Sequence, residues 1–236
     1  MKHITLKDNT PRRLSFYLAM EEYVARRMTH IDDAFFMWQV EPSVIFGRNQ
    51  VLENEVNTTY CREHGVQMYR RKSGGGCVYA DMGNVMLSFI TSDDSVALTY
   101  NRYVNMVLLV FHKMGIEAHA SGRNDILIGD RKVSGNAFYQ LPGRSIVHGT
   151  LLYDTDMENM LASITPSHEK LAKHGVESVR QRITLLREHT TLGIEEVKKL
   201  FVDTLCSEDC QLGDDEVSAI EQIERQYLKE EFINRL

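Results

Sequence analysis

RRKSGGGCVYADMGN, residues 70–84, places three successive glycines between two segments of strand-like composition. Gly74–Gly76 permit positive φ angles and a close approach of the main chain to a ligand, and their N–H groups can form a nest that holds an anion. Arg70 and Arg71 add fixed positive charge in a fork geometry that suits phosphate or carboxylate. The stretch matches neither GxxxxGK[ST] nor a strand-to-helix GxGxxG, so the common nucleotide fingerprints do not apply. Taken alone, it is more simply a glycine turn between two strands with solvated arginines.

The segments around this stretch predict an α+β fold. Apolar alternation and β-branched content favour several short strands, which span 34–40, 43–47, 66–70, 77–80, 85–90, 125–129, 132–139 and 145–153. Apolar stripes at helical spacing favour helices over 14–28, 100–114, 157–164, 194–205 and 216–232. The polar residues 165–182 predict a long loop. We therefore expect a mixed β-sheet flanked by helices in a single domain, residues 1–236, whose segment from about 194 to 236 is helical.

Composition narrows the function classes. The chain has 236 residues, 43% of them hydrophobic, which suffices for a sizeable core. A formal net charge of −6 argues against a general nucleic-acid binder, whose surface is basic. The apolar runs are too short for a membrane span, the N-terminus lacks a secretion signal, and four cysteines are too few for a disulfide scaffold. We expect a cytoplasmic protein in which Cys206 and Cys210 are ordinary helix-face residues.

SGRNDILIGDRKVSGNA, residues 121–137, supplies a second set of polar residues beside glycine turns. Lys132 follows a turn and begins a strand, so its ammonium group can point into a cleft while Gly135 leaves room beside it. Asp125 can hold a metal ion or orient Lys132, and both roles stay open. Taken singly, Lys132 is more often an exposed surface lysine.

The order of four motifs is more specific than any one of them. The two stretches above are followed by VHGTLLYDTDM (147–157) and KLAKHGVESVRQRIT (170–184). This series resembles the lipoate–protein ligase family, whose catalytic domains carry RRxSGGGxVxxDxGN, SGRNDL…GxRKVSGxA, HGTLL and KLxxKGxxSVRxRV. The resemblance runs from YLAMEE (17–22) to about Thr184. It implies the biotin/lipoate ligase type of catalytic domain, here without the usual C-terminal accessory domain.

The resemblance also implies an activity. Such enzymes use ATP with Mg²⁺ to adenylate lipoate, and they then pass the lipoyl group to a lysine of a carrier domain. The implied partners are the apo lipoyl domains of 2-oxoacid dehydrogenase E2 subunits and the glycine-cleavage H protein, with a separate accessory-domain protein as a further candidate. Nucleic acid and membranes are not implied.

Site residues follow from the same resemblance. Lys132 matches the family's essential lysine, which contacts both the acid carboxylate and the α-phosphate. The ATP- and adenylate-binding positions are Arg71, Gly76, Cys77, Val78, Tyr79, Asp125, Lys132 and Arg180. The lipoate-binding positions are Arg70, Ser73, Gly74, Gly75, Lys132 and His148. Residues 165–182 match the loop that folds over the adenylate.

Two alternatives stay open. An octanoyl- or lipoyl-transferase of the same fold works through an acyl-cysteine, but HASGRNDI (119–126) carries no cysteine near Lys132. A non-catalytic protein that binds lipoate or a carrier domain is the second, although retention of Lys132 and both arginines counts against it. A biotin ligase is less favoured, because GRGRxG is absent.

Overall fold

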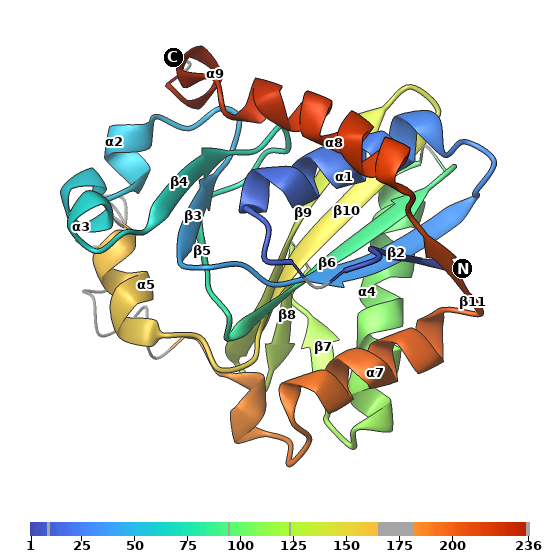
Figure 1. Cartoon of the computed structure of the whole chain (residues 1–236). Helices are drawn as coiled ribbons and strands as arrows, with labels where there is room; N and C mark the ends of the chain where they lie inside the picture. The colour runs from blue at the N-terminus through green and yellow to red at the C-terminus, as the bar shows by residue number, and fades with distance from the viewer. Residues whose placement is uncertain (9, 94, 123, 165–181, 235–236) are drawn as a thin grey trace.

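An eight-stranded mixed sheet forms the centre of the computed structural model, which describes residues 1–8, 10–93, 95–122, 124–164 and 182–234 (Figure 1). The strand order is β11-β1-β2-β6-β10-β9-β8-β7. The strands are β1 (Lys2–Thr5), β2 (Asp33–Trp38), β6 (Asn84–Thr91), β7 (Ala118–Ala120), β8 (Asp125–Ile128), β9 (Arg131–Leu141), β10 (Arg144–Leu152) and β11 (Glu208–Gln211). The pairs of β1 with β2 and with β11 are parallel, and the other neighbours are antiparallel.

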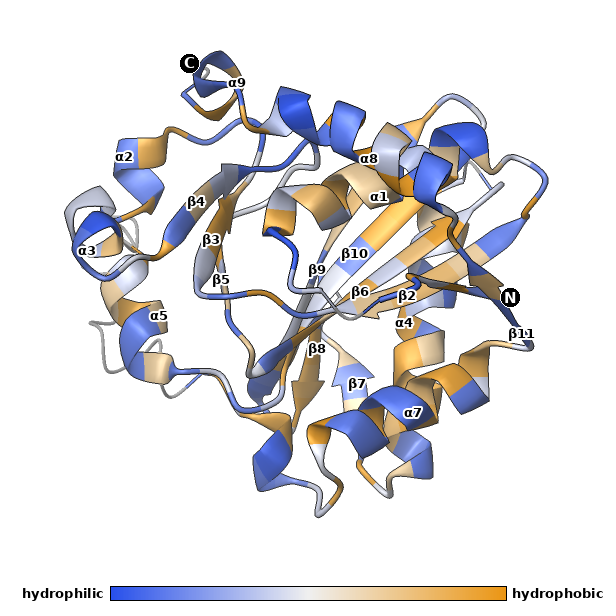
Figure 2. Ribbon diagram, viewed as in Figure 1, coloured by the Kyte–Doolittle hydropathy of each residue, from blue (hydrophilic) through white to orange (hydrophobic). Residues whose placement is uncertain are grey.

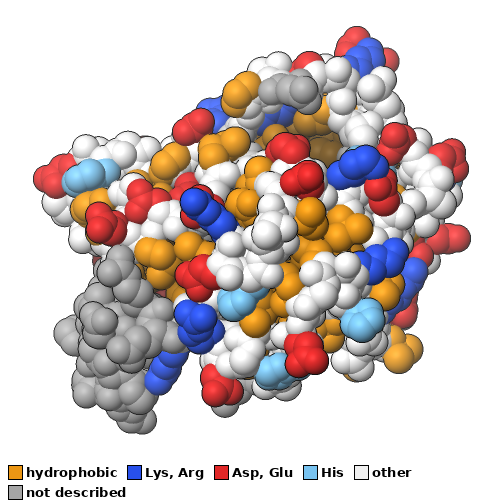
Figure 3. Space-filling model, turned by 90° about the horizontal axis from the view of Figure 1, so that it is seen from below, with side chains coloured by type: hydrophobic (Ala, Val, Ile, Leu, Met, Phe, Trp, Pro, Cys, Tyr) orange, Lys and Arg blue, Asp and Glu red, His pale blue; other side chains and the backbone are white. Residues whose placement is uncertain are grey.

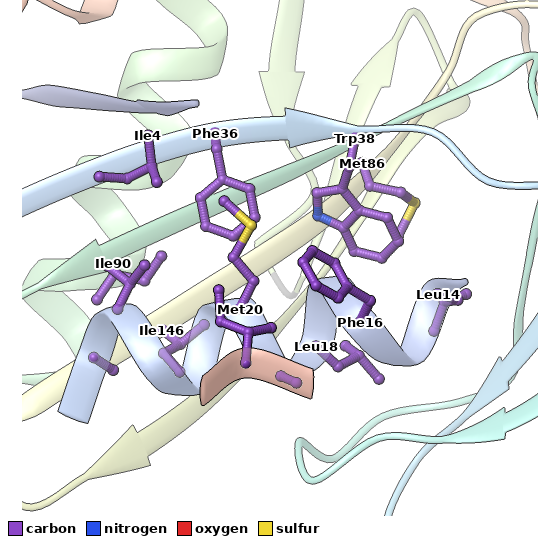
Figure 4. Packing of buried hydrophobic residues seen from close by; sticks show 14 of the residues in the cluster. Ile4, Leu14, Phe16, Leu18, Met20, Phe36, Trp38, Met86, Ile90 and Ile146 are labelled. Atoms are coloured by element: carbon purple, nitrogen blue, oxygen red, sulfur yellow. The ribbon is translucent and has the colours of Figure 1, made fainter. Parts of the chain in front are cut away.

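Helices cover both faces of this sheet. On one face, α1 (Leu14–Arg27) lies against the strands and α8 (Asp214–Tyr227) packs on α1. Figure 4 shows Phe16 and Met20 of α1 against Phe36 and Ile90 of the sheet. On the other face lie α4 (Val96–Lys113) and α7 (Ile194–Leu205), which bury a second apolar cluster. The predicted mixed sheet flanked by helices is therefore confirmed.

A small second sheet carries the strand that leads into the glycine run. Its order is β4-β3-β5, with bounds β4 (Gln67–Arg70), β3 (Ser43–Phe46) and β5 (Val78–Ala80). It packs beside three short helices, α2 (Leu52–Glu55), α3 (Thr58–Glu63) and α5 (Met157–Ser163), around a third apolar cluster. Figure 1 shows this unit beside the large sheet. The sequence did not predict that the strands at 34–40 and 43–47 enter different sheets.

Several local predictions need correction. Cys206 ends α7 and Cys210 lies on β11, so neither is a helix-face cysteine, and all four cysteines are free thiols. The helix predicted from residue 100 begins at Val96, because the Ser95 side chain accepts a hydrogen bond from Leu98 N. The predicted C-terminal helix ends at Tyr227 and is followed by a separate short helix, α9 (Glu230–Ile233).

Apolar residues lie mainly in the interior of the fold, and polar residues lie mainly on its surface (Figure 2). Figure 2 shows orange, apolar stretches on the strands and on the inner sides of the helices, with blue stretches facing outward. In the space-filling view of Figure 3, hydrophobic side chains are interspersed with charged ones over the visible face. Among the described residues, no helix combines the length and the apolar character needed to cross a membrane.

Candidate active site

Arg70, the first arginine of the glycine stretch, is turned into the protein. It is 2% exposed, and its Nη1 donates to the carbonyl oxygens of Gly47, Arg48 and Gln50 at 3.2, 3.1 and 2.8 Å. Its Nε donates to the carbonyl oxygen of Ile233 at 2.9 Å. Buried guanidinium groups require such partners. Arg70 thus ties α9 and the segment after β3 to the glycine loop, and its contact with lipoate remains a prediction.

Arg71 shapes the glycine loop itself. Its guanidinium donates to the carbonyl oxygen of Gly74 at 2.8 Å and to that of Gly76 at 2.7 Å. Burial lowers the pKa of Arg71 to about 10, so the group is cationic at neutral pH. In a planar trans peptide the N–H points opposite to the preceding C=O. The amides of Gly75 and Cys77 therefore point away from the guanidinium, where they are able to hold an anion.

Two glycines allow the loop to pack this closely. Gly75 has φ +93°, and a Cβ added to it would lie 2.9 Å from Nη2 of Arg71. A Cβ on Gly47 would lie 2.2 Å from the carbonyl oxygen of Gly75, a distance that no side chain tolerates. The backbone of Gly75 therefore packs directly against Gly47, where no side chain has room.

Gly47→Ala is expected to lower the free energy of unfolding by about 1–3 kcal/mol, because backbone must move away from the new methyl group. Gly74→Ala is the matched control, since its added Cβ meets nothing within 4 Å and its φ is not positive. Urea unfolding of both variants measures the difference. Equal stabilities would contradict the packing described for Gly47.

Lys72 ties the loop to both helices of the α1 face. Its Nζ lies 2.5 Å from Oε2 of Glu22 on α1 and 4.7 Å from the ring centroid of Tyr227 on α8. Glu22 is 6% exposed and also accepts from Arg26 Nε at 2.8 Å and from the Tyr227 hydroxyl at 3.1 Å. Burial alone raises the pKa of Glu22, but Lys72 and Arg26 outweigh it and hold the pKa below its usual value.

A pH-dependent stability difference should follow from this lowered pKa. The ionised Glu22 carboxylate contributes stability above its unfolded pKa near 4.5, and the contribution is lost as pH falls through the lower, folded pKa. We expect Glu22→Gln to cost about 1–3 kcal/mol at pH 7, and the cost to shrink below pH 4.5. Thermal unfolding from pH 3 to 7 measures it, with the exposed Glu53→Gln as control. A cost that does not change with pH would refute the assignment.

Ser73 begins a buried chain of hydrogen bonds that reaches β2. Its Oγ lies 2.8 Å from Nε2 of His148, and Nδ1 of His148 lies 2.9 Å from Oε2 of Glu21. Ser88 donates to Oε1 of Glu21 at 2.5 Å, and Trp38 Nε1 donates to Ser88 at 2.9 Å. The two ring nitrogens of His148 thus join Ser73 of the glycine loop to Glu21 of α1. Glu21, Ser88 and Trp38 were not among the predicted site residues, although Glu21 lies within YLAMEE (17–22).

Lys132 stands at the start of β9, beside Asp125 at the start of β8. Its Nζ lies 2.8 Å from Oδ1 of Asp125, and both side chains remain about one-third exposed. Gly135 pairs with Asp125 across the two strands, and a Cβ on Gly135 would lie 2.6 Å from the lysine Nζ. The prediction that Gly135 leaves room for Lys132 is confirmed.

One face of the sheet connects these groups. Directly paired residues share a face, and the pairs Asp125–Gly135, Gly135–Thr150, Thr150–Met86 and Met86–Trp38 form a row across five strands. At roughly 4.8 Å per strand, β9 and β2 are about 14 Å apart. His148 lies two residues from Thr150 along β10, so it shares this face, and the glycine loop reaches it through Ser73.

The remaining predicted nucleotide positions divide between core and loop. Tyr79 is 1% exposed and packs in the third apolar cluster with Val44 and Phe46. Val78 is half-buried on β5. Burial raises the pKa of the Cys77 thiol to about 12, so it is not a thiolate at neutral pH. Arg180 lies outside the described residues.

The DMGN part of the first motif joins two turns. The carboxylate of Asp81 accepts N–H bonds from Gly83 at 2.8 Å and from Asp156 at 2.9 Å. A Cβ on Gly83 would lie 2.2 Å from the carbonyl oxygen of Asp154. These contacts fix the start of β6 against the segment after β10, so this part of the motif has a structural explanation.

Metal-binding capacity is limited in this region. Across the described parts of the chain, no group of three His, Cys, Asp or Glu side chains is placed to hold a metal ion. Asp125 supplies one carboxylate, which is paired with Lys132. This donor set fits a magnesium ion that arrives with phosphate ligands of its own and not one held by protein alone.

The sequence is similar to a known family of catalytic domains and to proteins of two bacteria. The model of the lipoyl protein ligase A/B catalytic domain matches residues 14–206. Lipoate–protein ligase 1 of Staphylococcus aureus is 35% identical over 230 residues, which cover 94% of this chain and 70% of that protein. Lipoate-protein ligase LplJ of Bacillus subtilis is 37% identical over 181 residues, which cover 76% of this chain and 54% of that protein.

Solved structures agree with this sequence similarity. A bi-partite lipoate protein ligase from Thermoplasma acidophilum, solved in work that includes its E2 lipoyl domain, superimposes with a TM-score of 0.86. The sequences are 25% identical, and the alignment covers 100% of this chain and 96% of that one. On the family match and the Staphylococcus relative, this chain belongs to the family of lipoyl protein ligase A/B catalytic domains.

Proposed function

We propose that this chain is an ATP-dependent lipoate–protein ligase that forms lipoyl-adenylate and transfers the lipoyl group to a lysine of a carrier domain. The observation that supports this most directly is Lys132, held beside Asp125 in the space that Gly135 leaves open. Family membership supports the same reaction class. Residues 1–236 are proposed to act as one catalytic domain.

The first half-reaction joins two anions. A lipoate carboxylate oxygen forms a bond to the α-phosphorus of ATP, and the bond from that phosphorus to the bridging oxygen breaks, releasing pyrophosphate. Repulsion between the carboxylate and the phosphate is the main barrier that fixed charge is able to lower. Lys132 is proposed to lie between the two anions, and the outward amides of Gly75 and Cys77 are proposed to hold phosphate oxygens. Asp125 keeps the ammonium group in place until the substrates bind.

Arg71 lies on the side of the glycine loop that faces away from the proposed phosphate site. Its guanidinium holds the carbonyl oxygens of Gly74 and Gly76 and thereby directs the loop amides outward. A cation beneath the loop also makes its surface more favourable for phosphate. The role proposed for Arg71 is thus to orient the loop. Its charge acts on the nucleotide through the loop and not by direct contact.

The acyl chain is proposed to lie along the face that joins Lys132 to Trp38. From Gly135 on β9 to Trp38 on β2 this face spans about 14 Å, which exceeds what an eight-carbon acid needs. Gly135, Thr150 and Met86 along it are small or flexible residues. Ser73 and His148 border this face from the loop side and from β10. Their predicted contact with lipoate fits that position.

Magnesium is proposed to enter as a complex with ATP. Bound there, it would neutralise the polyphosphate and stabilise the leaving pyrophosphate. Asp125 is the carboxylate within reach of Lys132 that is available to this ion, and the phosphates would supply most of the remaining ligands.

The second half-reaction needs no enzyme nucleophile. The carrier lysine attacks the carbonyl carbon of the mixed anhydride as a neutral amine, the bond from that carbon to the AMP oxygen breaks, and the nitrogen loses a proton to water as the amide forms. The raised pKa of Cys77 argues against an acyl-cysteine at this loop. Proposed carriers are the lipoyl domains of 2-oxoacid dehydrogenase E2 subunits and the glycine-cleavage H protein. A separate accessory-domain protein is proposed as a partner in the first step, and the cytoplasm as the compartment.

The test is to incubate the protein with MgATP and lipoate, and then with apo H protein or an apo E2 lipoyl domain. We expect pyrophosphate release that depends on lipoate, and a carrier whose mass increases by one lipoyl group. Pyrophosphate release without lipoate, or carrier lipoylation without ATP, would contradict the proposal. The second result would favour the transferase alternative.

A further inference from the structure

Both main-chain groups of Lys132 are bonded to a segment that is remote in sequence. The N–H of Lys132 donates to the carbonyl oxygen of Arg182 at 2.7 Å, and the N–H of Thr184 donates to the carbonyl oxygen of Lys132 at 2.9 Å. Lys132 and Ile183 thus form a parallel bridge. The pairing of β9 with β10 ends at Ser134, so residues 182–184 take over that edge of β9 where β10 stops.

A buried hydroxyl holds this segment in place. Thr184 is 1% exposed, and its hydroxyl donates to Oε2 of Glu188 at 2.8 Å. A hydroxyl has one proton, so the contact of 2.7 Å between Thr184 Oγ1 and Nε2 of His189 requires the imidazole to donate. Leu186, which follows Thr184 by two residues, is fully buried in the second apolar cluster. It fixes η1 (Leu186–Glu188) to the core. Arg131, the neighbour of Lys132, lies 3.5 Å from the same Glu188 oxygen.

We infer that Thr184, held by Glu188 and His189, is a positioning residue for Lys132. This inference rests on the proposed function, because it assigns Thr184 a part in placing the ammonium group between two anions. The Arg131–Glu188 pair is exposed to solvent and contributes little by itself. The buried Thr184 hydroxyl, with two partners, is the contact that sets the position of residues 182–184 against Lys132.

The position matters because catalysis by a fixed charge depends on placement. Lys132 reaches the site through a long flexible side chain, and Gly135 and Asp125 define where its Nζ lies. A shift of its main chain moves Nζ out of that space. A displacement of about 1 Å in such a group costs up to roughly 10²-fold in rate.

The test compares three variants. Thr184→Val keeps the shape and removes the hydroxyl, and Thr184→Ser keeps the hydroxyl. Thr91→Val is the matched control. Thr91 is 2% exposed, and its hydroxyl also donates to a carboxylate, Oδ1 of Asp33, at 2.8 Å. It lies at the end of β6 that is remote from Met86 and the proposed site. Pyrophosphate release with lipoate and MgATP gives kcat and KM, and thermal unfolding reports stability.

We expect Thr184→Val to lower kcat for adenylation by about ten- to hundredfold, with both KM values within about twofold. Thr184→Ser should restore most of the rate, and Thr91→Val should leave it unchanged while losing similar stability. If Thr184→Val is as active as Thr91→Val, or if the serine variant is as slow as the valine one, the inference is wrong.

A second measurement needs no turnover and separates this inference from the proposed function. Trace labelling with acetic anhydride, followed by peptide mass spectrometry, reports the reactivity of Lys132 relative to the exposed Lys199. Thr184→Val should change the Lys132 to Lys199 labelling ratio by more than twofold, and Thr184→Ser should not. An unchanged ratio overturns the inference, whereas a wild-type protein that releases no pyrophosphate overturns only the proposed function.

Discussion

Lys132→Ala is expected to slow lipoyl-adenylate formation by roughly 10²–10³-fold, because one preorganised cation aimed at developing negative charge lowers a barrier by about 3–4 kcal/mol. The side chain is one-third exposed and begins a strand, so its truncation should leave thermal stability nearly unchanged. Lipoate-dependent pyrophosphate release measures the rate. A variant within about threefold of wild type would remove Lys132 from the mechanism.

Two controls make this result specific. Lys132→Arg should also fail, because a planar guanidinium does not occupy the position of a compact ammonium group in the space beside Gly135. Lys199→Ala removes another lysine whose Nζ lies 2.5 Å from an aspartate, Asp203, but on the exposed surface of α7. It should keep the wild-type rate. Loss of activity in Lys199→Ala would show that the assay reports general instability.

Much of the fold was predictable because long strands carry their own pattern. β6 is a fully buried run of apolar and small polar residues, and β10 is the same apart from Arg144 and His148, a pattern that marks central strands of a sheet. The edge strand β11 and its neighbour β1 read EDCQ and KHIT, with little apolar character, and they were not predicted. They exist because residues more than 200 positions apart pair with one another, as Lys2 does with Glu208. Such pairing leaves no local signal.

The site was predictable where its geometry is local. Asp125, Lys132 and Gly135 lie on adjacent strands joined by a tight turn, so sequence spacing places them together. Side-chain direction was less predictable. Arg70 and Arg71 look like solvated ligand-binding arginines in the sequence, yet their guanidinium groups are buried and hold backbone carbonyls.

Glu21 shows the opposite difficulty. A glutamate in an amphipathic helix is normally exposed, so YLAMEE did not indicate a buried acid. Glu21 is 3% exposed, and it is compensated by His148 and Ser88, which lie on two strands of the large sheet. Only the three-dimensional structure brings those partners to it.

The methyl group of alanine at position 135 should be almost as harmful as loss of the lysine. An added Cβ would lie 2.6 Å from Nζ and 2.7 Å from Cε of Lys132, both closer than any real Cβ contact. The lysine end is flexible, so it will move and the strand will not. Gly135→Ala is therefore expected to fold normally and to adenylate lipoate about 10²-fold more slowly, since displacement of a catalytic group by about 1 Å costs that much.

A double-mutant cycle decides whether the methyl group acts through Lys132. If it does, Gly135→Ala in a Lys132→Ala background should cost less than about twofold, because the group it displaces is already gone. If the methyl group instead blocks the substrate directly, the two effects should multiply, and the double variant should be about 10⁴–10⁵-fold slower than wild type. Pyrophosphate release from the four proteins, with KM for lipoate measured in each, distinguishes the outcomes. A multiplicative result would mean that the methyl group does not act through Lys132. The substrate would then pass directly over Gly135 when it binds.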